Sequence, residues 1–189
     1  MTKPIVIFFS RSYQSDLFPL LHSDSYESVH VTLTEHEKIK IEKLGHKVEF
    51  CFELYEKSCD LPNNDYLETS FLSDRFLNRY KSKDRIEFLE KEISFWGDIY
   101  DTYKPIAVIN EQVAIEIAEV MYIEAEKRNI PYKAWMTNPV NGYFYWTSNP
   151  MSLSLDKNIF DTEPSAASFD IAKEYLENVI IKNERPYYL

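Results

Sequence analysis

Short apolar runs alternate with longer amphipathic segments along this chain, and this alternation restricts the fold more than any other feature. Two runs, "PIVIFFS" (4–10) and "PIAVIN" (105–110), are continuously apolar, as is typical of strands buried on both faces of a sheet. Two others, 28–34 and 47–54, alternate apolar and polar residues, which indicates one wetter face. A mixed run, 131–137, is the fifth predicted strand. The continuous runs predict central strands, and the alternating runs predict strands nearer an edge.

The segments between these runs have the three- and four-residue periodicity of amphipathic helices. Helices are predicted over 35–46, 83–105, 112–131 and 165–182. Strands that alternate with helices favour a parallel sheet with right-handed crossovers. The sequence therefore predicts an α/β fold, a Rossmann-like three-layer sandwich whose mainly parallel, doubly wound sheet has an order such as 3-2-1-4-5.

Length, charge and cysteine usage exclude several classes of protein. A chain of 189 residues suits one domain with its own core. The net charge of −10 disfavours nucleic-acid binding, and no apolar run is long enough for a transmembrane segment. Cys51 and Cys59 have neither the number nor the spacing of a disulfide framework or metal site, which favours a cytoplasmic location. Scattered histidines and only three glycines predict no metal and no phosphate-binding cofactor loop.

A ligand site is predicted where the strand order of the sheet reverses. In doubly wound sheets, ligands bind beyond the carboxyl ends of the strands at that point. The loop after the first strand and the loop after the fourth meet there. Their polar residues are Ser10, Arg11, Ser12, Tyr13 and Gln14 from the first loop, and Asn110, Glu111 and Gln112 from the second.

Glu111 is the candidate catalytic residue, because a carboxylate at this position could take a proton from a sugar hydroxyl or hydrogen-bond two hydroxyls. The alternative is an acid favoured by the start of the next helix. Arg11, Ser12 and Asn110 are candidate ligands of an anionic or polyhydroxyl substrate. For Arg11 the alternative is a surface ion pair at the end of a strand.

Asp74 and Arg75 form a second candidate pair of substrate-binding residues. They lie in a stretch, 56–80, without a clean period, and long irregular segments inside compact domains are often functional. An arginine fork can bind a carboxylate or phosphate at two points. An ordinary helix-start acid beside an arginine explains the pair equally well.

The segment "NGYFYWTSNP" (141–150) contains four consecutive aromatic residues. A nucleic-acid stacking surface needs flanking positive charge, and this segment has none. A sugar-stacking surface is one interpretation. The favoured interpretation is an extended segment after the fifth strand, with aromatic residues on both of its sides.

The order of four motifs resembles the N-terminal half of bacterial capsule and surface-polysaccharide biosynthesis proteins with a two-domain, GT-B-like glycosyltransferase architecture. These motifs are "FLSDRFL" (71–77), "YKPIAVINE" (103–111), "AEKRNIPYKAW" (125–135) and "NPVNGYFYWTSNP" (138–150). The resemblance covers roughly residues 70–189. It departs from the family near the start of the aromatic segment, where a basic residue is usual and this chain has Asn138 to Asn141.

The resemblance implies that residues 1–189 form a single Rossmann-like domain, the acceptor-side half of a glycosyltransferase that lacks its donor-binding half and is inactive alone. Asp74, Arg75 and Glu111 match the polar positions of the family. The implied partners are a sugar or glycan acceptor, and a nucleotide-sugar donor bound through the missing C-terminal domain. Peripheral association with a membrane is compatible with this role. The alternative is a non-catalytic α/β module that binds a glycan or a protein partner.

Overall fold

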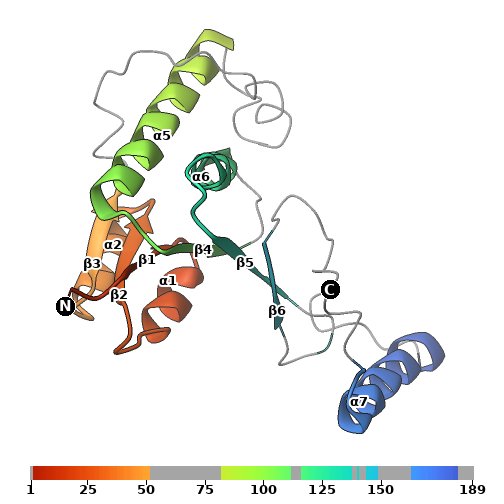
Figure 1. Cartoon of the computed structure of the whole chain (residues 1–189). Helices are drawn as coiled ribbons and strands as arrows, with labels where there is room; N and C mark the ends of the chain where they lie inside the picture. Colours follow the sequence, from red (N-terminus) through yellow and green to blue (C-terminus); the bar gives the residue numbers. More distant parts are fainter. Residues whose placement is uncertain are drawn as a thin grey trace.

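The computed structural model describes residues 2–51, 82–111, 116–137, 140, 144–148 and 163–182. These residues form a six-stranded sheet in the order β3-β2-β1-β4-β5-β6, flanked by helices (Figure 1). The strands are β1 (Ile5–Phe9), β2 (Glu27–Thr32), β3 (Lys47–Phe50), β4 (Ala107–Glu111), β5 (Tyr132–Thr137) and β6 (Phe144–Thr147). The helical segments are α1 (Gln14–Leu17), η1 (Phe18–Leu20), α2 (Glu35–Glu42), α5 (Ser82–Tyr103), α6 (Glu116–Lys127), α7 (Ala166–Leu176) and η4 (Glu177–Ile181).

This topology confirms the predicted α/β fold class with its doubly wound, mainly parallel sheet. Strands β1 to β5 pair in parallel in the predicted order, and β1 and β4 are central. The aromatic segment contributes β6, which pairs antiparallel with β5 and brings Trp135 opposite Trp146. The third strand is shorter than predicted: it ends at Phe50, whereas the alternation extended to 54.

The continuous apolar character of β1 follows from burial on both faces. Its side chains alternate, so Ile7 and Phe9 join the core beneath α5 and α6. Val6 and Phe8 face the opposite side, where they pack with Phe18 of η1. Because α1 and η1 cover one face while α5 and α6 cover the other, neither face of this strand can carry polar residues without a partner.

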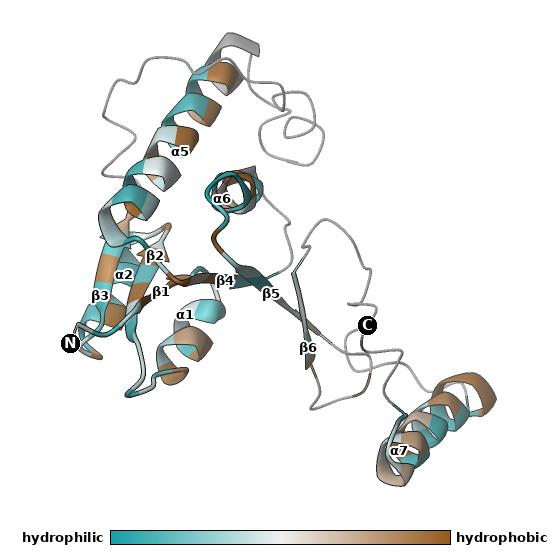
Figure 2. Ribbon diagram, viewed as in Figure 1, coloured by the Kyte–Doolittle hydropathy of each residue, from teal (hydrophilic) through white to brown (hydrophobic). Residues whose placement is uncertain are grey.

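Two hydrogen bonds from aromatic side chains join α5 to α6. The indole Nε1 of Trp96 donates to the carbonyl of Ile117 at 2.9 Å, and the hydroxyl of Tyr100 donates to the carbonyl of Met121 at 2.8 Å. Both donors are buried and lie one helical turn apart, as do their acceptors. These two hydrogen bonds fix the register between the two helices. Their donors lie on the face of α5 whose apolar residues Figure 2 shows in brown.

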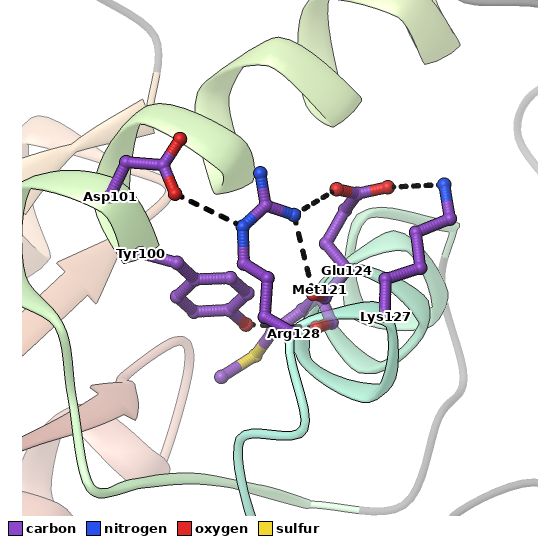
Figure 3. A network of polar contacts seen from close by, with 6 residues as sticks. All are labelled: Tyr100, Asp101, Met121, Glu124, Lys127 and Arg128. Atoms are coloured by element: carbon purple, nitrogen blue, oxygen red, sulfur yellow. Dashed lines mark hydrogen bonds and ion pairs between the residues drawn. The ribbon is translucent and has the colours of Figure 1, made fainter.

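A network of charged side chains links the C-terminal ends of α5 and α6 (Figure 3). Arg128 donates through Nε to Asp101 at 3.2 Å and through Nη1 to Glu124 at 2.5 Å. Lys127 donates to the other oxygen of Glu124 at 2.8 Å, so the buried carboxylate is paired with two cations. A Cβ atom at Gly97 would lie 3.2 Å from Nη2 of Arg128, so glycine permits the close approach of this guanidinium.

Helix α2 begins with a reciprocal capping arrangement. The side chain of Thr34 accepts from the amide of Glu37 at 3.3 Å, and Glu37 accepts from the amide of Thr34 at 3.0 Å. The helix ends at Glu42, and Gly45 follows with φ of 86°, close to the predicted stop. Lys40 of α2 contacts Asp16, which places α2 beside α1.

Helix α7 lies beyond the β6 edge of the sheet (Figure 1) and has no buried residue. Its start agrees with the prediction: the Ser165 side chain caps the helix by accepting from the amide of Ser168 at 3.1 Å. Among the helices of the described residues, none combines the length and the apolar character that crossing a bilayer requires.

Candidate functional site

The loops after β1 and β4 meet at the carboxyl edge of the sheet, where the winding reverses. β1 ends at Phe9 and is followed by a tight turn in which Ser12 has φ of 50°, the left-handed region that few non-glycine residues adopt. Helix α1 then begins at Gln14. β4 ends at Glu111 itself, so the carboxylate projects at the junction of the two loops.

Three side chains of the first loop converge on Glu111. The hydroxyl of Tyr13 donates to Oε1, and the side-chain amide of Gln14 donates to Oε2. The guanidinium of Arg11 lies 3.6 Å from Oε2 and balances the charge of the carboxylate. A carboxylate has about four lone-pair positions, so Glu111 keeps capacity for a ligand after these contacts.

Tyr13 is a hydrogen-bond donor at any ordinary pH. Burial, and next the hydrogen bond to ionised Glu111, raise the pKa of Tyr13 above its usual value of 10.0. The phenol therefore stays protonated, and its ring packs edge-on against Trp135 at 6.0 Å between centroids. Tyr13 thus contacts Glu111 through its hydroxyl and Trp135 through its ring.

Two buried polar atoms of the residues that contact Glu111 have no hydrogen-bond partner among the described residues: Nε of Arg11 and Oε1 of Gln14. Oδ1 of Asn110 has none either, but this side chain lies on the other face of β4 from Glu111. The other side-chain atom of Asn110 is used, because Nδ2 donates to the hydroxyl of Tyr132 at 3.0 Å. Orphaned buried polar atoms are costly, and they gather where a protein holds water or a ligand. The site therefore offers one unused donor and one unused acceptor, Nε of Arg11 and Oε1 of Gln14, beside its carboxylate.

Glu37 supports the first loop, although sequence reasoning did not single it out. Its Oε1 accepts from the backbone amide of Ser12 at 2.5 Å, while Oε2 accepts from the amides of Leu33 and Thr34. The signal was present in the sequence, since Thr34 and Glu37 have the spacing of a capping box. Ser12, a predicted ligand contact, is thus anchored through its backbone amide, and its side chain is exposed. Its substrate role stays a prediction.

An apolar groove of about 240 Å³ adjoins this polar centre. It is lined by Leu17, Phe18, Leu21, Trp135, Phe144 and Trp146. Two of these residues, Phe144 and Trp146, come from the aromatic segment and lie on the same face of β6. The aromatic segment therefore has both the predicted extended structure and a surface that borders the candidate site.

The remaining candidates are placed as follows. Asp74, Arg75 and Gln112 lie outside the described residues, so their role stays a prediction. Within the described part of the chain, no three metal-ligating side chains come together. The polar centre thus consists of Glu111 and the residues of the β1 loop.

The fold and this site define an α/β protein with a doubly wound sheet and a cluster of polar side chains at its switch point. No protein-family model and no curated protein matches the chain. Among solved structures, it is similar to UDP-GlcNAc 2-epimerase from Neisseria meningitidis bound to UDP-GlcNAc, with 11% sequence identity and a TM-score of 0.40. The similarity covers 98% of this chain and 45% of that enzyme, so the chain spans less than half of its length. The kinship with capsule biosynthesis proteins stays a prediction.

Proposed function

We propose that this chain binds a sugar at Glu111 and is the acceptor-side domain of a glycosyltransferase that builds cell-surface polysaccharide in the cytoplasm. The observation that supports this proposal is the convergence of Arg11, Tyr13 and Gln14 on the Glu111 carboxylate at the switch point of the sheet. A single carboxylate held by three donors is a fixed hydrogen-bond acceptor.

A sugar hydroxyl matches the hydrogen-bonding groups around Glu111. Each hydroxyl can donate one hydrogen bond and accept others. It could donate to Glu111 or to the unused oxygen of Gln14, and accept from Nε of Arg11 after a small movement of these side chains. The ring of Tyr13 and the neighbouring Trp135 offer apolar surface to the CH groups of a sugar.

The contacts suit Glu111 to clamp the acceptor hydroxyl. Two hydrogen bonds and one ion pair hold its carboxylate in place. In the transfer, the acceptor oxygen bonds to the anomeric carbon of the donor sugar while the bond to the nucleoside diphosphate breaks. The hydroxyl proton leaves to a base, and Glu111 orients that hydroxyl or accepts the proton.

The donor nucleotide sugar requires a further domain under this proposal, and Asp74 and Arg75 remain proposed ligands of the acceptor. The isolated chain is therefore expected to bind an acceptor sugar and to catalyse no transfer. Measured turnover of a nucleotide sugar by these 189 residues alone would contradict the proposal that a further domain binds the donor.

Sugar binding can be measured on the isolated chain by NMR titration with N-acetylglucosamine, glucose and galactose. We expect amide shifts to change at residues 10–14 and 110–111. Glu111→Ala should weaken binding by about tenfold or more, because hydrogen bonds to a charged group contribute about 1.5–3 kcal/mol each.

The matched control is Glu126→Ala. Glu126 is an exposed carboxylate that also accepts from a tyrosine, Tyr122, at 3.1 Å, but it lies on α6 away from Glu111. It should leave sugar binding unchanged. Absence of binding by every sugar, or equal losses from both variants, would refute the proposed site.

A non-catalytic binding module is the second candidate, and the wholly apolar groove beside Trp135 supports it. Such a groove suits an aromatic or aliphatic group of a glycan or peptide better than a reacting hydroxyl. Transferase activity of the natural full-length protein with a panel of nucleotide sugars distinguishes the two, because only the enzyme consumes the donor.

A further inference from the structure

The apolar groove begins one strand away from Glu111. In the register of the sheet, Glu111 on β4 lies beside Trp135 on β5, and Trp135 lies beside Trp146 on β6. Register partners project from the same face of a sheet, and neighbouring strands are about 4.8 Å apart. The three side chains therefore form one row, with the carboxylate at one end and Trp146 about 10 Å away at the other.

Aromatic contacts connect the polar side chains around Glu111 to the groove. Tyr13 donates to Glu111 through its hydroxyl, and its ring centroid lies 6.0 Å from that of Trp135. The ring of Trp135 lies 5.9 Å from Phe144, and Phe144 lies 5.8 Å from Trp146, again between centroids. A ligand that extends from Glu111 along this row thus passes directly from a charged group to an apolar surface.

The groove has room for an apolar group and no hydrogen-bonding partner for a polar one. Its lining is wholly apolar and its volume is about 240 Å³. An apolar cavity of about 150 Å³ already holds benzene, so a phenyl ring or a short alkyl chain fits. Phe144 and Trp146 are 54% and 36% exposed, and an apolar ligand would shield their rings from water. A second sugar ring would find no partner there for its hydroxyls, whose burial then costs free energy.

We propose that the sugar bound at Glu111 carries an apolar aglycone, an alkyl or aryl group, and that this group lies in the groove. The acceptor is then an amphipathic glycoside, with a sugar hydroxyl at the carboxylate and the aglycone between the α1–η1 segment and β6. This inference rests on the proposed sugar site and adds the chemical class of its acceptor.

The test compares glycosides that differ only in their aglycone. The methyl, hexyl and phenyl β-glycosides of glucose, galactose and N-acetylglucosamine are titrated into the whole chain by calorimetry. We expect the hexyl or phenyl glycoside to bind about tenfold more tightly, or more, than the methyl glycoside of the same sugar, since each buried CH₂ group contributes about fourfold. A gain with the hexyl group identifies an alkyl aglycone, and a gain with the phenyl group alone identifies an aromatic one.

Three variants separate the groove from the carboxylate. Phe144→Ser should reduce the gain in affinity by about fivefold or more, because it removes a ring that the aglycone covers. Glu111→Ala should weaken all three glycosides and leave the gain unchanged. The control is Leu44→Ser, since Leu44 is 57% exposed, much like Phe144, but lies in the turn after α2 and should keep the gain. Circular dichroism checks that each variant is folded.

The indole N–H signals of the three tryptophans report the position of the aglycone by NMR. The signals of Trp135 and Trp146 should shift more with the hexyl and phenyl glycosides than with the methyl glycoside. Trp96 is the internal control, because it is buried between α5 and α6 and donates to the carbonyl of Ile117. Its signal should stay in place.

The outcomes distinguish a failure of the groove from a failure of the sugar site. Equal affinity for the three glycosides, or a gain that Phe144→Ser does not reduce, would overturn the aglycone and leave the sugar site standing. Absence of binding, or binding that Glu111→Ala does not weaken, would refute the sugar site and this inference with it. Cellobiose that binds as tightly as the hexyl glycoside would overturn the aglycone in favour of a second sugar.

Discussion

Acidification should destabilise this fold through one buried histidine. His30 on β2 is fully buried, stacks on Phe8 at 5.2 Å between ring centroids, and has Nδ1 2.8 Å from the hydroxyl of Ser10. The ring of His46 lies 4.9 Å away. Burial, and then the charge on His46, lower the pKa of His30 from 6.5 to about 3. The folded protein therefore holds this imidazole neutral where the unfolded chain takes up a proton.

The sign and size of the effect follow from proton linkage. Between the two pKa values the unfolded chain binds more protons than the folded one, so the free energy of unfolding falls as pH falls. The contribution of His30 is complete above its unfolded pKa of 6.5 and is lost progressively down to about 3. At about 1.4 kcal/mol for each pH unit, the upper limit is about 5 kcal/mol. Roughly 2 kcal/mol of this is lost between about pH 7 and pH 5.

The assay is urea unfolding at about pH 7 and about pH 5, followed by tryptophan fluorescence, because buried Trp96 reports on the core. The test variant is His30→Asn, whose amide oxygen can accept from Ser10 but cannot titrate. Its loss of stability between the two pH values should be smaller than that of the wild type by about 2 kcal/mol. The control, His36→Asn, replaces an exposed histidine and keeps the pH dependence due to His30.

Equal losses in the wild type and His30→Asn would refute the reasoning. If His30→Asn does not fold, NMR titration of the imidazole signals in the wild-type chain gives the answer directly. A measured pKa of His30 at or above its usual value of 6.5 would also refute the proposed role of this histidine.

Four substitutions test local contacts and backbone conformation by urea unfolding. Tyr100→Phe should cost about 1 kcal/mol, because a buried carbonyl of α6 loses its donor; an unchanged midpoint would contradict this. Lys104→Gly should gain up to about 1 kcal/mol by relieving a left-handed φ of 45°. Asn129→Gly, at φ of 55°, should gain less because asparagine tolerates this region, and the reverse order would be inconsistent. Glu37→Ala should destabilise by at least about 1 kcal/mol and speed hydrogen exchange at the Ser12 amide; unaltered exchange there would exclude its supporting role.

The pattern of apolar residues was sufficient to predict the five parallel strands and their order, but not the pairing of β6. The continuous run of β1 indicated burial on both faces, and its side chains alternate between two packed layers in the structure. The alternating run at 47–54 indicated an outer strand, and β3 is at the edge. Local periodicity could not set where β3 ends, because an alternating pattern is compatible with several end points until neighbouring strands limit the pairing.

The predicted topology indicated the edge of the sheet and the two loops that form the candidate site. The side-chain contacts within the site were not predicted. Tyr13 was noted only as a loop residue and Gln14 as a possible ligand contact beside Arg11, yet both hold the Glu111 carboxylate. The amide nitrogen of Asn110 bonds buried Tyr132, a contact that the sequence did not indicate, and its substrate role stays a prediction. A polar residue in a loop has several partners within reach, and its sequence neighbours do not select among them.

The sequence alone determined the fold class and the central position of β1 and β4, because hydrophobic burial acts through patterns that repeat every two or every three to four residues. It also predicted the edge at which the candidate site lies. Only the tertiary structure decided which groups meet Glu111, how Glu37 fixes the Ser12 loop, and that α7 leaves its apolar face uncovered by the described residues. Such contacts join residues as far as 98 positions apart along the chain. They depend on how strands and helices pack together, which no local pattern records.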